Sequence, residues 1–389
     1  MTRVYADHAA TTRPAPEVVA AMLPWLHDSF GNATSVHTRG EAARDAIEGA
    51  RLEVARLLGA QAEELVFTAT GSESNNLAIV GTLLASPERR RIVTTAIEHS
   101  SVLECARALE AEGFVLTVLP VRRNGTVDPD VVAEAMGDDV ALVSVMALNN
   151  ETGVLQPIEE LGALVKQAGA VFHVDAVQAP GRIAIAVDGW QADLVSIAAH
   201  KFHGPLGAAA LFVRRRTRLE PIVRGGQHER GLRAGTENVA AIVGMGVAAT
   251  RARLALTGGA PARVSELGDR LLAELLAKVS DTTLNGDLNR RAGGTVNVCF
   301  AGVEGEAVLH ELDRAGIEVS TGSACSHALA GPSHVLIAMG LTPDQAHASV
   351  RFSLGEDNTE QDVIRIGEVV PPVVQRLRAL GGTTMERSA

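Results

Sequence analysis

The chain has 389 residues, of which 46% are hydrophobic and 21% charged, and its mean hydropathy is +0.14. This length allows two domains with large cores, and the net charge of −11 argues against nucleic acid as a main partner. We find no signal peptide, no apolar run long enough to cross a bilayer, and three cysteines without zinc or disulfide spacing, so we expect a cytoplasmic protein with no membrane contact and no metal site.

The first predicted elements lead to a turn that suits a phosphate group. They are a short strand, two helices and a second strand (within 1–13, then 16–26, about 40–58, and 64–68). Thr70 and Glu73 follow with the spacing of a capping box, which predicts that a helix begins here. Gly71 and Ser72 would then present backbone N–H groups at the positive end of that helix.

The next two predicted strands also end in polar residues. Residues 92–97 are followed by His99, and the strand from residue 140 is followed by Asn150. Ligands of layered α/β sheets collect at the carboxyl ends of strands. His99 is therefore a candidate to stack on a cofactor ring and transfer protons, because its pKa lies near neutrality. Asn150 is a candidate contact for cofactor or substrate.

Two more apolar runs end in an acid and an amine. Asp175 ends one, and Lys201 follows the other twenty-six residues later, about one strand-connection-strand unit. Only three of the 35 basic residues are lysines, and an amine can form a Schiff base whereas guanidinium cannot. Lys166 and Lys278 lie late in amphipathic helical patterns, where a lysine needs only solvent. We therefore interpret Lys201 as the reactive lysine.

These residues match the requirements of pyridoxal phosphate. This cofactor needs an amine for its covalent link, an acid for its ring nitrogen, an aromatic group to stack on the ring, and a cradle for its phosphate. Lys201, Asp175, His99 and the turn at Gly71 would supply these four parts.

The second half of the chain contains a long polar loop and a predicted domain boundary. Residues 225–238 are too glycine-rich and too long for a simple connector, which is typical of functional loops. Residues 257–261 mark the boundary, so we predict a large domain of residues 14–255. Residues 1–13 and 256–389 would form the small domain.

The predicted small domain supplies a thiol and a buried cation. Cys325 lies among small and polar residues between two glycines, in a loop that would leave its thiol accessible as a nucleophile. Arg351 lies in an apolar strand. A buried arginine needs an anion, and a substrate carboxylate would form a bidentate pair with it.

Taken together, these motifs resemble the cysteine desulfurases of the NifS/IscS type, in the class V aminotransferase family. The resemblance covers essentially the whole chain and is nearest to the nitrogen-fixation branch. The segments that carry it are 7–12, 30–32, 67–77, 98–99, 149–153, 173–178, 200–201, 227–238, 321–325 and 350–354.

The resemblance implies an α/β protein of PLP-dependent fold type I. The large domain would hold a mixed, mostly parallel seven-stranded sheet, beside a smaller α/β C-terminal domain with the cysteine loop. It also implies a homodimer with its active site at the subunit interface. In the implied site, the cofactor contacts Lys201 and Asp175, His99 stacks on its ring, and Gln178 and Asn150 lie near its phenolic oxygen. Its phosphate is held by Gly71, Ser72 and His200, and by Thr236 of the partner subunit. The substrate carboxylate is bound by Arg351.

The implied reaction converts L-cysteine to L-alanine and leaves a persulfide on Cys325. The sulfur would pass to an acceptor protein for iron–sulfur cluster assembly, with nitrogenase among the candidate recipients. Two positions depart from the family pattern, because Ala198 stands where a phosphate-binding serine is usual and Leu206 where a lysine is common. Ala198 removes one hydroxyl donor.

Two other interpretations remain open from the sequence. Another pyridoxal phosphate lyase or aminotransferase, such as a selenocysteine lyase, would share every site except the need for Cys325. A non-catalytic sulfur-relay or scaffold protein would need none of the cofactor residues, and a colourless purified protein would favour it.

Overall fold

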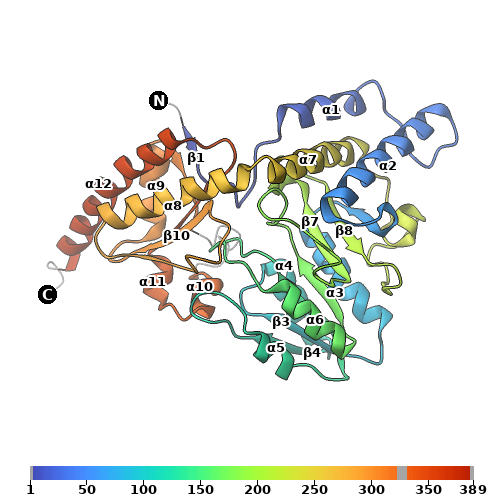
Figure 1. Cartoon of the computed structure of the whole chain (residues 1–389), viewed down its shortest axis with the longest axis horizontal. Coiled ribbons are helices and arrows are strands. Elements are labelled where there is room, and N and C mark those ends of the chain that lie inside the picture. The colour runs from blue at the N-terminus through green and yellow to red at the C-terminus, as the bar shows by residue number, and fades with distance from the viewer. Residues whose placement is uncertain (1–2, 322–330, 386–389) are drawn as a thin grey trace.

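The computed structural model describes residues 3–321 and 331–385. Its largest feature is a seven-stranded sheet in the order β2-β8-β7-β6-β5-β3-β4 (Figure 1). The strands are β2 (Leu65–Thr68), β3 (Arg91–Thr95), β4 (Val115–Leu119), β5 (Val140–Met146), β6 (Val171–Asp175), β7 (Leu194–Ala198) and β8 (Ala209–Val213).

Most neighbouring strands of this sheet are parallel. Strands β4, β3, β5, β6 and β7 run in one direction, whereas β8 is antiparallel to both β7 and β2. The parallel strands therefore end at one edge, which is where α/β sheets bind their ligands. The predicted mixed, mostly parallel seven-stranded sheet is confirmed.

Helices cover both faces of the sheet. Neighbouring residues of a strand point to opposite faces, so Phe67 belongs to the core cluster that includes residues of α1, α2, α5, α6 and α7, whereas Val66 belongs to the cluster that includes residues of α3 and α4. A sheet buried on both sides needs apolar residues at successive positions, which explains the unbroken run in β5. The helices are α1 (Pro16–Leu26), α2 (Thr38–Leu58), α3 (Gly71–Ala85), α4 (Ser100–Ala111), α5 (Pro129–Glu134), α6 (Ile158–Ala168) and α7 (Val239–Thr257).

Helix α7 is strongly apolar, although it contains no uninterrupted apolar run of bilayer length. It has 19 residues and is long and apolar enough to cross a membrane by length and composition. However, half of its apolar window is buried, with Ala241, Met245 and Ala248 inside the core and α1 and α2 packed against it. Packing inside the protein accounts for its apolar sequence.

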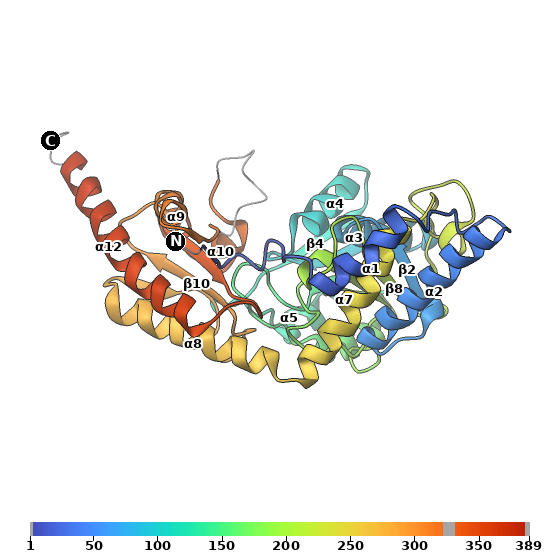
Figure 2. The same cartoon turned by 90° about the horizontal axis from the view of Figure 1, so that it is seen from above.

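The remaining elements form a smaller α/β unit beside the large sheet (Figure 2). An antiparallel sheet in the order β12-β10-β9 packs with α8, α9 and α12 around a separate core, and β1 pairs in parallel with β11. These elements are β1 (Val4–Tyr5), α8 (Ala260–Lys278), β9 (Thr282–Leu284), β10 (Thr295–Phe300), α9 (Gly305–Arg314), β11 (Ile317–Glu318), β12 (Ser349–Ser353) and α12 (Glu360–Met385). The domain limits at 13/14 and 255/256 stay a prediction.

Two short helices join the small unit to the ligand-binding edge of the large sheet. They are α10 (His334–Ala338) and α11 (Pro343–His347). Val335, Leu336 and Met339 pack against Ile97 and Met146, which lie at the carboxyl ends of β3 and β5. This contact brings the segment that follows the predicted cysteine loop to the edge where His99 lies.

The long polar loop is anchored by a buried ion pair. Within it, Glu229 receives both Nη1 and Nη2 of Arg51, on α2, at 2.7 and 2.8 Å, and the backbone N–H of Phe67 at 2.7 Å. Glu229 and Arg230 have positive φ angles of 45° and 57°, a strained conformation for residues with side chains. The buried pair therefore holds the loop in a conformation that its residues do not favour.

Glu229→Gln is expected to lower stability by about 3–5 kcal/mol, because it leaves the buried Arg51 charge without its main partner. Urea unfolding at fixed protein concentration, with cofactor in excess, measures the loss. Glu48→Gln is the matched control, since Glu48 contacts the same arginine from a side chain that is 55% exposed, and it should cost less than about 1 kcal/mol. Equal losses in the two variants would contradict the assignment.

Candidate functional site

One cleft gathers nine of the residues predicted for the site. It has a volume of about 330 Å³ and lies at the carboxyl ends of the parallel strands. The predicted residues that line it are Gly71, Ser72, His99, Asn150, Asp175, Gln178, His200, Lys201 and Arg351. Thr236 is exposed on the long loop and is not part of this lining, whereas Cys325 lies outside the described residues.

Lys201 ends the short 3₁₀ turn that follows β7. Its Nζ donates to the carbonyl oxygens of Ala9 and Ala10 at 2.8 and 2.7 Å. The N-terminal segment therefore crosses the cleft and orients the amine, although it is distant in sequence. Such an amine is placed to form the covalent link to a carbonyl cofactor.

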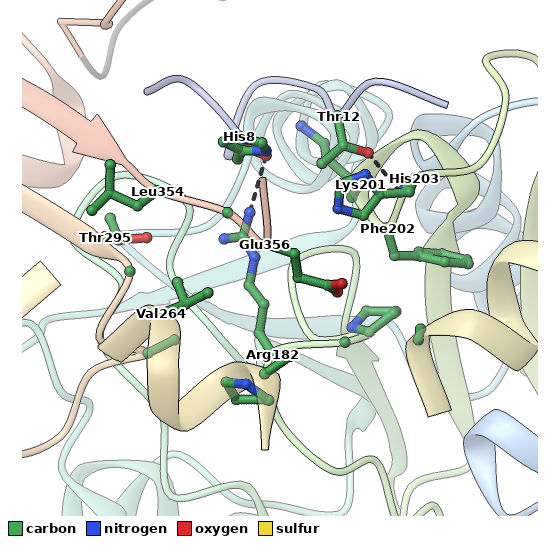
Figure 3. Close-up of a pocket in the computed structure, with 18 of the residues that line it drawn as sticks. His8, Thr12, Arg182, Lys201, Phe202, His203, Val264, Thr295, Leu354 and Glu356 are labelled. Atoms are coloured by element: carbon green, nitrogen blue, oxygen red, sulfur yellow. Dashed lines mark hydrogen bonds between the residues drawn. The ribbon is translucent and has the colours of Figure 1, made fainter. Parts of the chain in front are cut away.

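A second, smaller cavity lies behind Lys201, between the large and small units (Figure 3). Its volume is about 70 Å³, and Lys201 lines both this cavity and the cleft. Arg182 extends across it and donates from Nη2 to the carbonyl of His8 at 3.0 Å. Burial, with a contribution from the charge of Arg351, lowers the pKa of Arg182 to about 10. Lys201 is thus part of the wall of both spaces.

Asp175 is the last residue of β6 and is buried. Its Oδ1 accepts the backbone N–H of Val177 at 3.0 Å, and its Oδ2 accepts Nδ2 of Asn75 at 2.8 Å. A carboxylate held in this way can keep a pyridine nitrogen protonated. Asn75 was not predicted, because an asparagine in a helix gives no signal of what it faces.

His99 is the N-cap residue of α4, and its ring Nδ1 accepts the backbone N–H of Ser101 at 3.1 Å. Burial lowers the pKa of His99, and the charges of Lys201 and His334 lower it further, while Asp175 acts in the opposite direction. A neutral imidazole in the cleft is suited to stacking and to proton transfer.

The start of α3 forms the anion-binding part of the cleft. Oγ1 of Thr70 caps the helix by accepting the backbone N–H of Glu73 at 3.0 Å. The carboxylate of Glu73 accepts the backbone N–H of Ala69, at 2.8 Å, rather than that of Thr70. The predicted capping box is therefore only half formed. A Cβ on Gly71 would lie 2.9 Å from Val177, so the close packing here requires a glycine. The first-turn N–H groups of this 15-residue helix suit a phosphate.

His200 borders the cleft beside this helix start. Its Nδ1 lies 3.2 Å from Oγ1 of Thr11, and burial, followed by the charge of Lys201, lowers its pKa to about 4. A neutral imidazole can donate one hydrogen bond to an anion. His200 therefore fits the predicted phosphate contact.

The arginine predicted to bind substrate already has an anion. Arg351 donates from Nη2 to Oδ1 of Asp7 at 2.6 Å and from Nη1 to the carbonyl of Asn150 at 2.9 Å, and its side chain is 3% exposed. The sequence argument that a buried arginine needs an anion holds, but in this structure Asp7 supplies the charge. A substrate carboxylate would share the guanidinium with Asp7.

The contacts of Gln178 leave one acceptor available. Its Nε2 donates to the carbonyl of Ala9 at 2.8 Å, while its buried Oε1 has no partner among the described residues. An unpaired buried acceptor is costly, so a donor from a bound group is expected there. Together with Asp175, Lys201 and the start of α3, Gln178 forms a site that fits a phosphorylated pyridine.

Within residues 3–321 and 331–385, no cluster of His, Cys, Asp and Glu side chains suits a metal ion.

Comparisons with known proteins agree with this donor set. A model of the class V aminotransferases matches residues 4–366. The cysteine desulfurase of Trichormus azollae is 47% identical over 380 residues, 98% of this chain and 95% of the relative. The cysteine desulfurase NifS of Azotobacter vinelandii is 45% identical over 379 residues, 97% of this chain and 94% of that protein. The solved structure of a NifS-like protein has a TM-score of 0.91 at 33% identity and covers 97% of this chain and 100% of that one. The chain therefore belongs to the class V aminotransferase family and, within it, to the pyridoxal-phosphate-dependent cysteine desulfurases.

Proposed function

We propose that this desulfurase converts L-cysteine to L-alanine, holds the sulfur as a persulfide on Cys325, and supplies it for iron–sulfur cluster assembly. The observation that carries the proposal is that one cleft unites Lys201, Asp175, His99 and Arg351. Further support comes from a solved relative, 35% identical, that is described as a complex with cysteine, and from the NifS and IscS names of several relatives.

When pyridoxal phosphate is bound, it supplies an electron sink for the carbon skeleton of the substrate. Lys201 would hold it covalently, Asp175 would pair with its ring nitrogen, and Gly71, Ser72 and His200 would bind its phosphate. Thr236 of the partner subunit would complete the phosphate site. The remaining chemistry belongs to side chains that bind substrate and move protons.

Those side chains divide the reaction between binding, proton transfer and sulfur acceptance. Arg351 binds the substrate carboxylate and fixes its position, while Nζ of Lys201 moves protons at the substrate carbons. The thiolate of Cys325 attacks the substrate sulfur, so that an S–S bond forms and the C–S bond breaks. Carbon keeps the electron pair and takes a proton, which gives alanine.

The other two cysteines do not compete for this role. Burial raises the pKa of Cys105 to about 11, and burial also raises the pKa of Cys299. Both thiols stay protonated at neutral pH, and a thiol is a poor nucleophile compared with a thiolate. This supports Cys325 as the sulfur acceptor.

The proposal includes a homodimer with a shared active site. An apolar groove lies beside the cleft, between α1, the N-terminal segment and residues 204–206. Leu23, Leu26 and Leu206, which line it, are 57%, 67% and 73% exposed. Exposed apolar side chains that lie together are typical of a protein interface. A second copy of the chain is the proposed occupant, and its long loop would bring Thr236 to the phosphate site.

One experiment tests the activity and the use of the sulfur separately. The purified holoenzyme is given sulfur-labelled L-cysteine. Alanine and label on Cys325 are measured without reductant, and sulfide is measured after a reductant is added. Addition of an iron–sulfur scaffold protein and ferrous iron in a reducing buffer then tests sulfur transfer, because a reducing cytoplasm is the setting that we propose. Alanine formation without cluster formation would exclude the iron–sulfur role, and selenocysteine as the only productive substrate would exclude cysteine.

Ala198→Ser is expected to tighten cofactor binding. Ala198 lines the cleft, and a Cβ on Gly71 would lie 3.5 Å from the Cβ of Ala198, so a serine hydroxyl would reach the phosphate site. One neutral hydrogen bond contributes about 0.5–1.5 kcal/mol, so the dissociation constant should fall about threefold to tenfold, with little change in turnover at saturation. Titration of the cofactor-free protein measures this constant. Unchanged or weaker binding would mean that another donor already serves the phosphate.

A further inference from the structure

Four polar groups form a continuous hydrogen-bonded chain through one wall of the cleft. Nδ2 of Asn75 lies 2.8 Å from Oδ2 of Asp175 and 2.9 Å from Oγ of Ser101. Oγ of Ser101 lies 2.8 Å from Nδ1 of His99. The chain therefore joins the carboxylate at the end of β6 to the imidazole at the start of α4 through one residue of α3.

The direction of each hydrogen bond follows from the groups themselves. A carboxylate oxygen accepts, so the amide of Asn75 must turn its NH₂ group toward Asp175. That NH₂ group has two hydrogens, one for Asp175 and one for Ser101. Because Oγ of Ser101 accepts from Asn75, its own hydrogen is available to His99.

The donor and acceptor roles of these groups also determine which nitrogen of the His99 ring carries the proton. The backbone N–H of Ser101 can only donate, and it points at Nδ1 from 3.1 Å. With the Ser101 hydroxyl, Nδ1 faces two donors and cannot carry a hydrogen of its own. A neutral imidazole whose Nδ1 accepts carries its proton on Nε2.

We propose that Asn75 and Ser101 are positioning residues, which couple His99 to Asp175 and hold the His99 ring as the tautomer protonated on Nε2. Both side chains line the cleft, and Asn75 is 1% exposed. The proposal rests on the roles that Asp175 and His99 have in the proposed function. Asn75 donates both to the carboxylate of Asp175 and to the hydroxyl of Ser101. The His99 ring and the Asp175 carboxylate therefore keep a fixed distance and orientation relative to each other.

The proposal predicts a change in the pH dependence of turnover. The donors on Nδ1 favour the neutral ring, so Ser101→Ala should raise the pKa of His99 by about 0.4 to 1 pH unit, the equivalent of one hydrogen bond. Activity that needs neutral His99 is lost as pH falls through this pKa, and the acid limb therefore moves to higher pH. The ionisable groups that face His99, which are Asp175, Lys201 and His334, stay in place.

The kinetic test compares three variants with wild-type holoenzyme. Ser101→Ala should shift the acid limb and lower kcat about threefold to tenfold near that limb, while the KM for cysteine, which depends on Arg351, stays constant. Ser101→Thr keeps the hydroxyl and should restore the wild-type profile. Ser100→Ala is the control, because Ser100 is exposed and outside the chain. Superimposable profiles for Ser101→Ala and wild type would overturn the coupling.

A spectroscopic test reads the tautomer without reference to activity. Nitrogen NMR of holoenzyme with labelled histidine, with the His99 signals among the 12 histidines assigned from a His99→Gln variant, distinguishes an accepting Nδ1 from a protonated one. Wild type should show the proton on Nε2. Asn75→Ala frees the Ser101 hydroxyl to turn and leaves only the backbone N–H as a fixed donor to Nδ1, so it should raise the share of rings protonated on Nδ1. A proton on Nδ1 in wild type would overturn the proposal. Full turnover of His99→Gln would instead count against the proposed role of His99.

Discussion

Lys201→Arg should abolish desulfuration while the protein stays folded. The substitution keeps the positive charge, and the side chain can still reach the carbonyl oxygens of Ala9 and Ala10 that hold Nζ in the structure. Guanidinium, however, stays protonated and forms no Schiff base at neutral pH. We expect kcat to fall by at least about 10²- to 10⁴-fold, the loss typical of a positioned proton-transfer group.

The covalent link itself gives the second measurement for Lys201. The wild-type holoenzyme should be yellow, and treatment with borohydride followed by peptide mapping should place the cofactor on Lys201. Lys166 and Lys278 serve as internal controls, because they lie in α6 and α8, away from the cleft lining. A reduced adduct on either of them would contradict the assignment, as would normal turnover of Lys201→Arg.

The strands that end in the cleft residues could be predicted from sequence patterns, whereas the seven-stranded sheet as a whole was implied by the family resemblance. Apolar, β-branched runs that end in a single polar residue identify strands buried on both faces, and parallel strands place those ends together. His99, Asp175 and Lys201 were each predicted from such an end, and the structure brings all three into one cleft. These local patterns predict the strands well because a short run of apolar, β-branched residues favours a strand that is buried on both faces.

Contacts between distant segments were not predictable in the same way. The carbonyl groups of Ala9 and Ala10 hold Lys201 across more than 190 residues, and Asp7 pairs with Arg351 across 344. A backbone carbonyl has no residue-specific signal. Asn75 gave none either, since its function depends on where β6 and α4 lie relative to α3. The sequence therefore revealed the reacting groups but not the residues that orient them.

Helix α7 shows the same limit of local patterns. Its sequence has no uninterrupted apolar run of bilayer length, because Thr250, Arg251 and Arg253 interrupt it, yet the helix is long and apolar enough to cross a membrane by length and composition. In the structure, α1 and α2 pack against it and half of its apolar window is buried. These partners are distant in sequence, so the segment itself does not encode them.

Cys325→Ser should separate sulfur transfer from every other step. The variant should bind pyridoxal phosphate with unchanged affinity and should still bind cysteine, since the cleft residues that hold both are intact. A spectral change on addition of cysteine measures this binding. Alanine formation should fall by at least about 10³-fold and no persulfide should form, because a serine hydroxyl is a far weaker nucleophile toward sulfur than a thiolate.

Cys105→Ser and Cys299→Ser are the matched controls for this result. Cys105 packs at the edge of the core with α3 and α4, and Cys299 is buried in β10, so each variant removes a thiol whose pKa is raised by burial. Both should keep most of the wild-type turnover and should still carry labelled sulfur on Cys325. If Cys325→Ser instead makes alanine from cysteine at the normal rate, the thiol is not the acceptor and the sulfur leaves by a general lyase route. Loss of alanine formation in Cys105→Ser or Cys299→Ser, with Cys325 intact and the protein folded, would move the acceptor role to that cysteine.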